Sequence, residues 1–368
     1  MTVLSLRALN RATLSRQWLL ERRPASALEA IEQLVGMQSQ AALAPYTGLW
    51  TRLVDFDPSE LVELMHNRSV VRLSLMRSTI HLISADDALG IYPLLRSVHS
   101  RGLASNQQLA PLRATLDLDA LGAAGRRLLS ASPLSGPELG AALAEEFPGH
   151  EPSDLSRAVR DLLAGVQVPP RGIWGKGGQP VTTTLESWLD RPLTPYALET
   201  LVLRYLAAFG PATPMDMQQW SGLTHLTEIF DRLRPRLRTY TVEGTTRKVF
   251  DLESITLPDS DTPAPIRFMT EFDNLLIGYA DRTRVLPEEH RRHVFTNNGI
   301  IKPTLLLNGT TTATWKPTVT KSTARLTITP LAPIPKRHHP AIESEAHELL
   351  AFLAPTAEAH EIEFVSAP

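Results

Sequence analysis

Apolar residues at helical spacing divide the first part of the chain into separate helices. Between residues 5 and 22, apolar positions recur every three or four residues, and most arginines occupy other positions. Farther on, Ser26 followed by Glu29 has the spacing of a capping box, so we expect a second helix that ends near Gly36.

A unit of helices followed by strands is predicted next. A helix fits 58–65, and the β-branched residues and alternation at 69–83 indicate one or two strands. Helices followed by a β-ribbon are typical of a winged helix, a helix-turn-helix variant with a small hairpin. The same order recurs, with helices at 137–147 and 153–163 before an extended stretch at 166–184.

The order recurs once more, with helices at 198–209 and 226–233, a short helix capped by Thr213 between them, and strands within 238–252. Three such units in tandem are an organisational signal, although they share no clear sequence repeat.

From residue 266 the pattern changes to short runs of strand type. The runs are 267–270, 299–307, 311–316 and 325–329. Asn308–Gly309 between two of them is the strongest hairpin signal in the chain, and an acidic helix is expected at 342–353. The predicted fold class is α+β, with tandem winged-helix units followed by a small C-terminal β-barrel or sheet.

We expect four parts. They are 1–120 with the first winged helix, 121–192 with the second, 193–257 with the third, and a β-rich part at 258–368 that includes the acidic helix.

Composition excludes several classes of protein. With 43% hydrophobic and 21% charged residues, the chain can bury an ordinary core. The absence of cysteine excludes disulfides and thiolate chemistry, and no apolar stretch approaches the length of a membrane span. Arg7 and Arg11 interrupt the N-terminal apolar region, so it does not resemble a signal peptide, and a cytoplasmic location is expected.

Charge is distributed unevenly along the chain. The formal net charge of −2 argues against a strongly basic nucleic-acid binder. However, six glutamates and no lysine or arginine follow Arg337, so residues 1–337 carry a net charge of +4. Of the 37 basic residues 31 are arginines, whose planar fork suits phosphates and ordinary ion pairs alike.

The polar segment Gln38-Ser39-Gln40 is not explained by composition. Two amides two residues apart point to the same side of an extended segment, so they form either a functional pair or a solvated run after a helix. His290 and His293 favour a solvated helix face over a metal site, and neither a metal nor a cofactor is predicted.

Two further sets of residues are candidates for contacts with DNA. Arg77, Thr79 and His81 alternate along a predicted strand, so we expect their side chains on one face. That face is either a functional surface or an ordinary exposed strand face. A basic run suits a phosphate-contacting wing or a solvated surface, and its members are Arg232, Arg234, Arg236 and Arg238.

Together these segments resemble the AlkZ/YcaQ family of winged-helix DNA glycosylases. The matching stretches are Leu34 to Gln40, Gly48 to Arg52, Leu75 to Leu82, Arg171 to Trp174, Arg204 to Leu206, Phe209 to Thr213, Trp220 to Leu223, Glu271 to Leu276, Asp281-Arg282 and Asn308 to Trp315. They occur in order over nearly the whole chain.

The resemblance implies a monofunctional glycosylase that releases alkylated purines from double-stranded DNA, with Gln38 and Gln40 as the catalytic pair. The Gln–x–Gln form resembles the branch that unhooks interstrand crosslinks in producers of DNA-crosslinking natural products. For an element that enters a DNA groove, we consider the turn at Asn297–Asn298 or the hairpin at Asn308–Gly309.

Chemistry suggests where the two glutamines lie. A purine alkylated at N7 or N3 is already a cationic leaving group, so amides that position a water suffice. Because a crosslinked base is tethered to the other strand, we expect both glutamines on an open, concave surface of a monomer, away from the acidic tail. Arg77, Thr79 and His81 are expected nearby, where they either orient the loop or contact phosphate. The alternatives are a winged-helix transcriptional regulator without chemistry, and an inactive DNA-binding protein of the same ancestry.

Overall fold

The computed structural model describes residues 2–366. An N-terminal strand and helix precede the first of three similar units, which we call the first unit (residues 27–84). The elements of this part are β1 (Thr2–Leu4), α1 (Leu6–Arg16), α2 (Ala27–Gln33), β2 (Met37–Gln38), α3 (Ala44–Trp50), α4 (Pro58–His66), β3 (Val70–Ser74) and β4 (Ile80–Ser84). The predicted capping box is present, since the Ser26 and Glu29 side chains each bond the other residue's backbone N–H.

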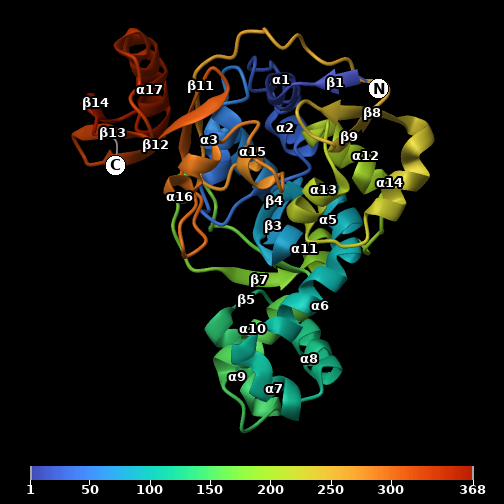
Figure 1. The fold of residues 1–368 in the computed structure, drawn as a ribbon. Helices are drawn as coiled ribbons and strands as arrows, with labels where there is room; N and C mark the ends of the chain where they lie inside the picture. Colours follow the sequence, from blue (N-terminus) through green and yellow to red (C-terminus); the bar gives the residue numbers. More distant parts are fainter. Residues whose placement is uncertain (1, 367–368) are drawn as a thin grey trace.

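The helices of the second unit (residues 118–184), with the short helix α7 before them, form the lower lobe of the molecule (Figure 1). The elements are α5 (Ala85–Ile91), α6 (Arg96–Ser105), α7 (Ala110–Thr115), α8 (Leu118–Ala131), β5 (Leu134–Ser135), α9 (Gly136–Glu146), α10 (Pro152–Leu162), β6 (Gly165–Gln167) and β7 (Val181–Thr184). Its strands continue the sheet of the first unit in the order β2-β4-β3-β6-β7-β5, so the two units share one sheet.

The third unit (residues 198–252) lies on the opposite side of the body from the C-terminal sheet (Figure 1). Its elements, with the short helix before them, are α11 (Leu185–Leu189), α12 (Leu198–Phe209), α13 (Pro214–Ser221), α14 (Thr227–Leu233), β8 (Leu237–Val242) and β9 (Lys248–Leu252). Strand β1 pairs parallel to β8, and Ala212 forms an isolated bridge with Phe250 of β9.

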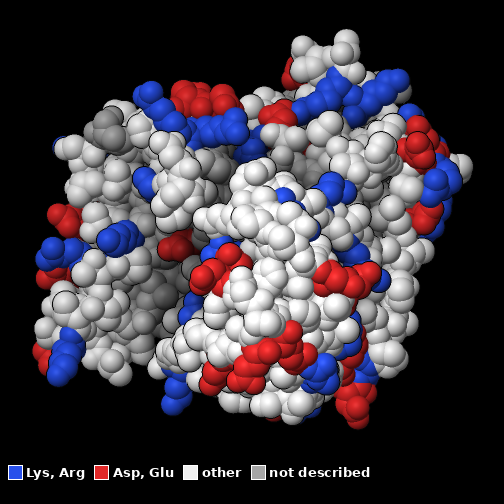
Figure 2. All heavy atoms as spheres, turned by 90° about the horizontal axis from the view of Figure 1, so that it is seen from below, with Lys and Arg blue, Asp and Glu red and all other residues white. Residues whose placement is uncertain are grey.

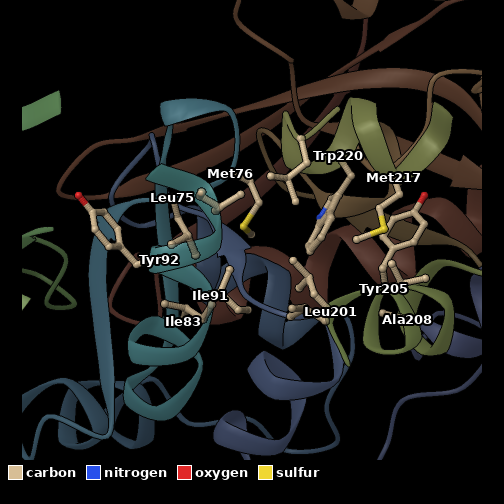
Figure 3. Packing of buried hydrophobic residues seen from close by; sticks show 14 of the residues in the cluster. Leu75, Met76, Ile83, Ile91, Tyr92, Leu201, Tyr205, Ala208, Met217 and Trp220 are labelled. Carbon is tan, nitrogen blue, oxygen red and sulfur yellow. The ribbon is translucent and has the colours of Figure 1, made fainter. Parts of the chain in front are cut away.

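A large apolar cluster joins the first and third units. Figure 3 shows Leu75 and Met76, which precede Arg77, in the same cluster as Tyr205, Met217 and Trp220 of the third unit. The packing fixes the hairpin between β3 and β4 against α13.

The C-terminal part is an open sheet covered by one long helix. Its elements are β10 (Arg267–Met269), α15 (Asn274–Ile277), α16 (Arg291–Val294), β11 (Thr304–Leu307), β12 (Thr310–Val319), β13 (Thr323–Pro330), α17 (His339–Leu353) and β14 (Ala359–Phe364). The predicted turn at Asn308–Gly309 connects β11 and β12, with both residues in the left-handed region.

The expected β-barrel is not formed. The strand order is β10-β11-β12-β13-β14, and within residues 2–366 the edge strands β10 and β14 do not pair. The barrel alternative was wrong because α17 packs against the sheet through Ile342, Ala346 and Leu349, and β14 returns parallel to β13. Within the same residues, no helix combines the length and apolarity needed to cross a bilayer.

Candidate active site

The segment Gln38-Ser39-Gln40 begins in an edge strand. The chain leaves α2 through two left-handed residues, Val35 and Gly36, and enters β2, where Gln38 lies opposite His81 of β4. The Ser39 N–H donates to the Ile80 carbonyl at 2.7 Å and continues this pairing. Because β2 is the outermost strand, the far edge of this segment has no neighbouring strand among residues 2–366.

A buried arginine holds the middle residue of the segment. The Arg72 guanidinium donates to the Ser39 hydroxyl at 3.0 Å and to the Ser39 carbonyl at 2.9 Å, and both side chains are buried. Gly172 covers this contact so closely that a Cβ there would lie 2.9 Å from Arg72 Cδ. Burial lowers the pKa of Arg72 to about 10, so the guanidinium remains charged near neutral pH.

A second arginine fixes the orientation of the Gln38 amide. Arg77 donates to Gln38 Oε1 at 2.6 Å and, through its other terminal nitrogen, to the Trp220 carbonyl. Since a guanidinium only donates, the amide oxygen must face Arg77 and the Gln38 NH2 group must face away. Burial and the neighbouring charge of Arg282 lower the pKa of Arg77 to about 10.

The two glutamines differ in exposure. Gln38 is only 7% exposed because it lies beneath Arg77, so the expectation of an open position was wrong for this residue. Gln40 is exposed, and its Oε1 accepts the Ile80 N–H at 3.2 Å. Both amide oxygens are therefore held by donors, and neither amide nitrogen has a partner in the described part of the chain.

Arg77, Thr79 and His81 do not share one strand face. Arg77 lies in a 3₁₀ turn (Met76–Ser78) between β3 and β4, and both Arg77 and Ser78 adopt left-handed backbone angles. Such angles are costly for residues with side chains and persist where the surroundings impose them. The turn is held by Trp220 and by a contact of 3.1 Å between the Ser78 hydroxyl and His99 Nδ1.

Thr79 and His81 instead stabilise the 3₁₀ turn through contacts with its backbone and with the residue that follows it. The Thr79 hydroxyl donates to the Met76 carbonyl at 3.0 Å, and His81 Nδ1 lies 2.8 Å from the Thr79 carbonyl. Burial and the nearby Arg77 charge lower the pKa of His81 to about 3. His81 is therefore neutral at any working pH and positions the backbone opposite Gln38.

The predicted basic run lies on the third unit, apart from this site. Arg232 forms an exposed ion pair with Glu199 at 2.6 Å, and Arg234 lies 3.2 Å from Asp231. Arg236 is exposed at the end of the following turn. The charges of Arg232 and Arg234 are thus compensated locally.

The two candidate groove elements differ in accessibility. Asn297 and Asn298 occupy an exposed turn after α16. The hairpin at Asn308–Gly309 packs on α1, where Arg11 donates to the Asn308 side-chain oxygen at 2.7 Å. This hairpin cannot enter a groove without leaving the helix that covers it.

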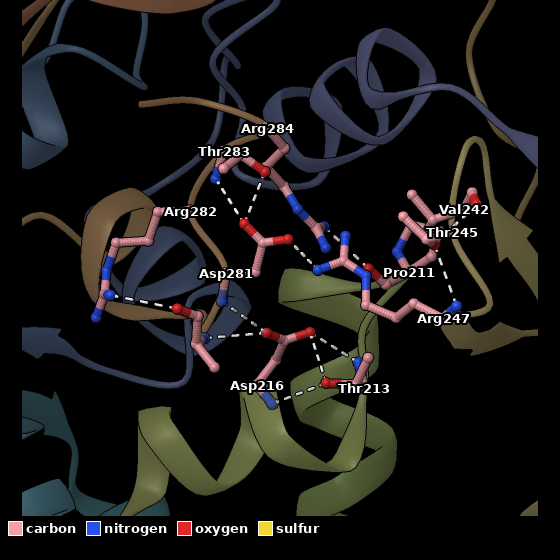
Figure 4. Close-up of polar contacts among 11 residues, drawn as sticks. Pro211, Thr213, Asp216, Val242, Thr245, Arg247, Asp281, Arg282, Thr283 and Arg284 are labelled. Atoms are coloured by element: carbon pink, nitrogen blue, oxygen red, sulfur yellow. Dashed lines mark hydrogen bonds and ion pairs between the residues drawn. The ribbon is translucent and has the colours of Figure 1, made fainter. Parts of the chain in front are cut away.

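Arg282 is close enough to Arg77 for its charge to lower the pKa of that guanidinium, and the sequence did not identify it as a site residue. It donates to the Leu276 carbonyl at 2.6 Å, and burial followed by the charge of Arg291 lowers its pKa. Figure 4 shows its segment fixed to the third unit, where Asp216 accepts the Ala280 N–H at 3.0 Å and Asp281 pairs with Arg247. The only available signal was the Asp281-Arg282 dipeptide.

The acidic tail has its own partners. Glu345 pairs with Arg22 at 2.6 Å and with Arg267 at 3.5 Å, and Glu361 pairs with Arg325 at 2.7 Å. Within residues 2–366 none of these groups contacts Gln38 or Gln40. Part of the negative charge of the tail is therefore compensated by Arg22, Arg267 and Arg325.

The overall architecture is that of a known DNA glycosylase. The solved structure of the Streptomyces sahachiroi DNA glycosylase AlkZ matches with a TM-score of 0.80 at 23% identity, covering 99% of this chain and 100% of that one. This likeness establishes a mixed α+β fold shared along the whole chain.

Sequence comparison places the chain in a family. The family model described as "DNA glycosylase AlkZ-like" matches residues 31–352, so the chain belongs to the AlkZ-like DNA glycosylases, as its motifs predicted. An interstrand DNA cross-link repair glycosylase of Streptomyces sahachiroi is 25% identical over 350 residues, which span 90% of this chain and 92% of that protein. The enzyme class is therefore DNA glycosylase.

Proposed function

We propose that the protein hydrolyses the N-glycosidic bond of cationic N7- or N3-alkylated purines in duplex DNA and unhooks interstrand crosslinks formed by such bases. The observation that carries the proposal is the pair of fixed amides at an open sheet edge, with Gln38 held by Arg77 and Gln40 by the Ile80 N–H. The name of the similar Streptomyces sahachiroi protein supports crosslinked DNA as the substrate.

The geometry limits what the two amides can do. Each carbonyl oxygen retains one lone pair, which can accept a hydrogen bond from a water placed near C1′. Arg77 withdraws electron density from the Gln38 oxygen, so this oxygen is a weak base, and His81 is neutral and cannot act as an imidazolium acid. The reaction therefore depends on a leaving group that is already cationic, with the amides supplying position.

We further propose that the three units are winged helices that bind the DNA duplex. In each unit the first strand pairs with the last, as β2 with β4, β5 with β7, and Ala212 with Phe250. The face in Figure 2 is hollowed between the lobe of α7–α10 and the part of the molecule to its left, and we propose that the duplex lies in this hollow. The proposed parts are 1–120, 121–192, 193–257 and 258–368, acting as a monomer.

DNA contacts are assigned from exposure and charge. Asn297, Asn298 and Arg236 are exposed and stand as proposed contacts, whereas Arg232 and Arg234 would first have to leave their carboxylates. Arg77 is assigned a positioning role because both of its terminal nitrogens are already engaged. Self-resistance to a DNA-alkylating natural product is the biological role that fits this chemistry.

A panel of lesions tests the proposal. Duplexes carrying N7-methylguanine, N3-methyladenine, a crosslinked N7-alkylguanine, hypoxanthine or uracil are incubated with the enzyme, and free base and abasic sites are measured. We expect release of the cationic bases alone. Release of hypoxanthine or uracil at a comparable rate would contradict the assigned chemistry, and release of no base at all would contradict the substrate class.

A further inference from the structure

A pocket begins immediately after the two glutamines. Ala41 and the residues that follow it line a cavity of about 560 Å³ between the first unit and the C-terminal sheet. Its walls are mostly apolar and include Trp174, Trp315 and Leu353. This volume lies in the range of sites for drug-sized ligands and exceeds what a methyl group needs.

The indole walls are held rigidly. The Tyr46 hydroxyl accepts the Trp174 backbone N–H at 3.0 Å and donates to the Gly172 carbonyl at 3.0 Å, and the rings of Tyr46 and Trp174 are 4.8 Å apart. Trp315 Nε1 donates to the Met269 and Thr304 carbonyls. The indole N–H of Trp315 is therefore satisfied, the backbone of Trp174 is fixed by Tyr46, and both rings line the pocket with apolar surface.

The rim of the pocket exposes apolar side chains to water. Leu43 is 40% exposed and Val319 is 55% exposed, and both line the pocket. They lie on different elements, one just before α3 and the other at the end of β12. Exposed apolar groups that converge on a concave surface are typical of a ligand site.

Glu271 gives the pocket a chemical preference. It is the single ionisable side chain among the described lining residues, and it has no hydrogen bond or ion pair within residues 2–366. The neighbouring acid differs, because Asp273 is buried and paired with Arg52 at 2.8 Å. Burial raises the pKa of Glu271.

The backbone directs Glu271 toward the pocket. Phe272 has a φ of 55°, a left-handed angle that is unusual for a bulky residue. This turn places Phe272 in the core beside Leu275 and Leu276 while Glu271 lines the cavity. Costly backbone angles of this kind cluster at functional sites.

We propose that this pocket binds the organic group attached to the alkylated purine, and that it selects an aromatic or apolar group bearing a protonated amine. The apolar walls would receive the ring, and the Glu271 carboxylate would pair with the amine. The inference rests on the proposed function, since only a lesion placed at Gln38 and Gln40 would deliver its adduct here.

The test uses three duplexes that differ only in the group on guanine N7. One carries a methyl group, one a naphthyl group with a primary amine, and one the same naphthyl group with a hydroxyl in place of the amine. A 2′-fluoro sugar at the lesion blocks hydrolysis for affinity measurements, and unfluorinated duplexes give single-turnover rates. The proteins are wild type, Glu271→Gln, and the control Glu228→Gln, which removes an exposed charge on α14.

We expect wild type and Glu228→Gln to bind the amine adduct about tenfold more tightly than the hydroxyl adduct, as a charge-assisted hydrogen bond provides. Glu271→Gln should lose this preference and should release N7-methylguanine at the wild-type rate. An unchanged preference in Glu271→Gln would overturn the proposal. So would an equal slowing of all three substrates, because Glu271 would then act in the chemistry.

Failure of the glycosylase assignment would look different. In that case wild type would release no base from any duplex, while the 2′-fluoro duplexes would still report whether the pocket prefers the amine. A preference without release would retain the pocket and remove the proposed function. Release of the bases without a preference for the amine adduct would retain the proposed function and remove the pocket proposal.

Discussion

The first and third units share an order of elements but differ where the first strand ends. In the third unit, Ala212 is followed directly by Thr213, which caps α13 in a capping box with Asp216. In the first unit, β2 ends at Gln38, α3 begins at Ala44, and α3 has no side-chain cap. The intervening residues contain Ser39, Gln40 and the start of the pocket.

The difference shows how a site can arise on a structural framework. A strand that runs straight into a capped helix leaves no free segment, whereas the uncapped α3 leaves a short loop that must be held by other groups. Arg72 and Arg77 supply that support through neutral acceptors. In the described chain neither arginine has a carboxylate partner, whereas Arg232 and Arg234 of the third unit both do.

The largest expected effect on stability concerns the buried ion pair that joins the first unit to the C-terminal part. Arg52 pairs with Asp273 through two hydrogen bonds of 2.9 and 2.8 Å, and both side chains are buried. Arg52→Ala should lower the free energy of unfolding by about 3–5 kcal/mol, because it leaves Asp273 charged and buried. Urea denaturation measures this loss. A change below about 1 kcal/mol would show that the pair does not hold the unit.

Acid should destabilise the first unit through its buried imidazole. The pKa of His81 is lowered to about 3, so the unfolded chain binds a proton below about pH 6.5 that the folded chain does not. Stability should fall as pH drops from 6.5 toward 3, by about 2 kcal/mol at pH 5. Denaturation of wild type and His81→Asn at pH 7 and pH 5 checks this, and equal losses in both would exclude His81 as the cause.

Arg77 should affect the rate of base release more than DNA binding. Arg77→Lys keeps a charge but loses the fork that joins Gln38 to Trp220, so release of N7-methylguanine should slow about tenfold. The affinity for the duplex should stay close to that of wild type. A matched loss of affinity would instead indicate that Arg77 contacts phosphate.

The exposed pair in the third unit should matter least. Arg232→Ala breaks only the surface contact with Glu199, and the free energy of unfolding should change by at most about 0.5 kcal/mol. Base release should remain at the wild-type rate. A large loss of DNA affinity in this variant would restore the basic run as a phosphate-contacting surface.

Local patterns predicted the local parts of the structure. The capping box at Ser26 and the turn at Asn308–Gly309 depend on neighbouring residues, and both are present. The helices between residues 85 and 131 were missed, although Asp117 is a recognisable cap for α8. The parallel pairing of β14 with β13 joins distant segments and leaves no periodic signal.

The candidate site was predicted only where it depends on neighbouring residues. The glutamines stand out as a polar pair, but the orientation of Gln38 depends on Arg77, whose other partner is the Trp220 carbonyl 143 residues away. Arg72 lies within an ordinary strand pattern, and Glu271 differs from Asp273 only through the fold around it. Contacts of this range are set by packing and are not encoded in spacing.

The central claim is that the fixed amides of Gln38 and Gln40 perform the hydrolysis. Its most direct test is the single-turnover release of N7-methylguanine by wild type, Gln38→Ala and Gln40→Ala, with duplex affinity measured in parallel. We expect each substitution to slow release about 100-fold while affinity stays close to that of wild type. Release at the wild-type rate by both variants would contradict the claim.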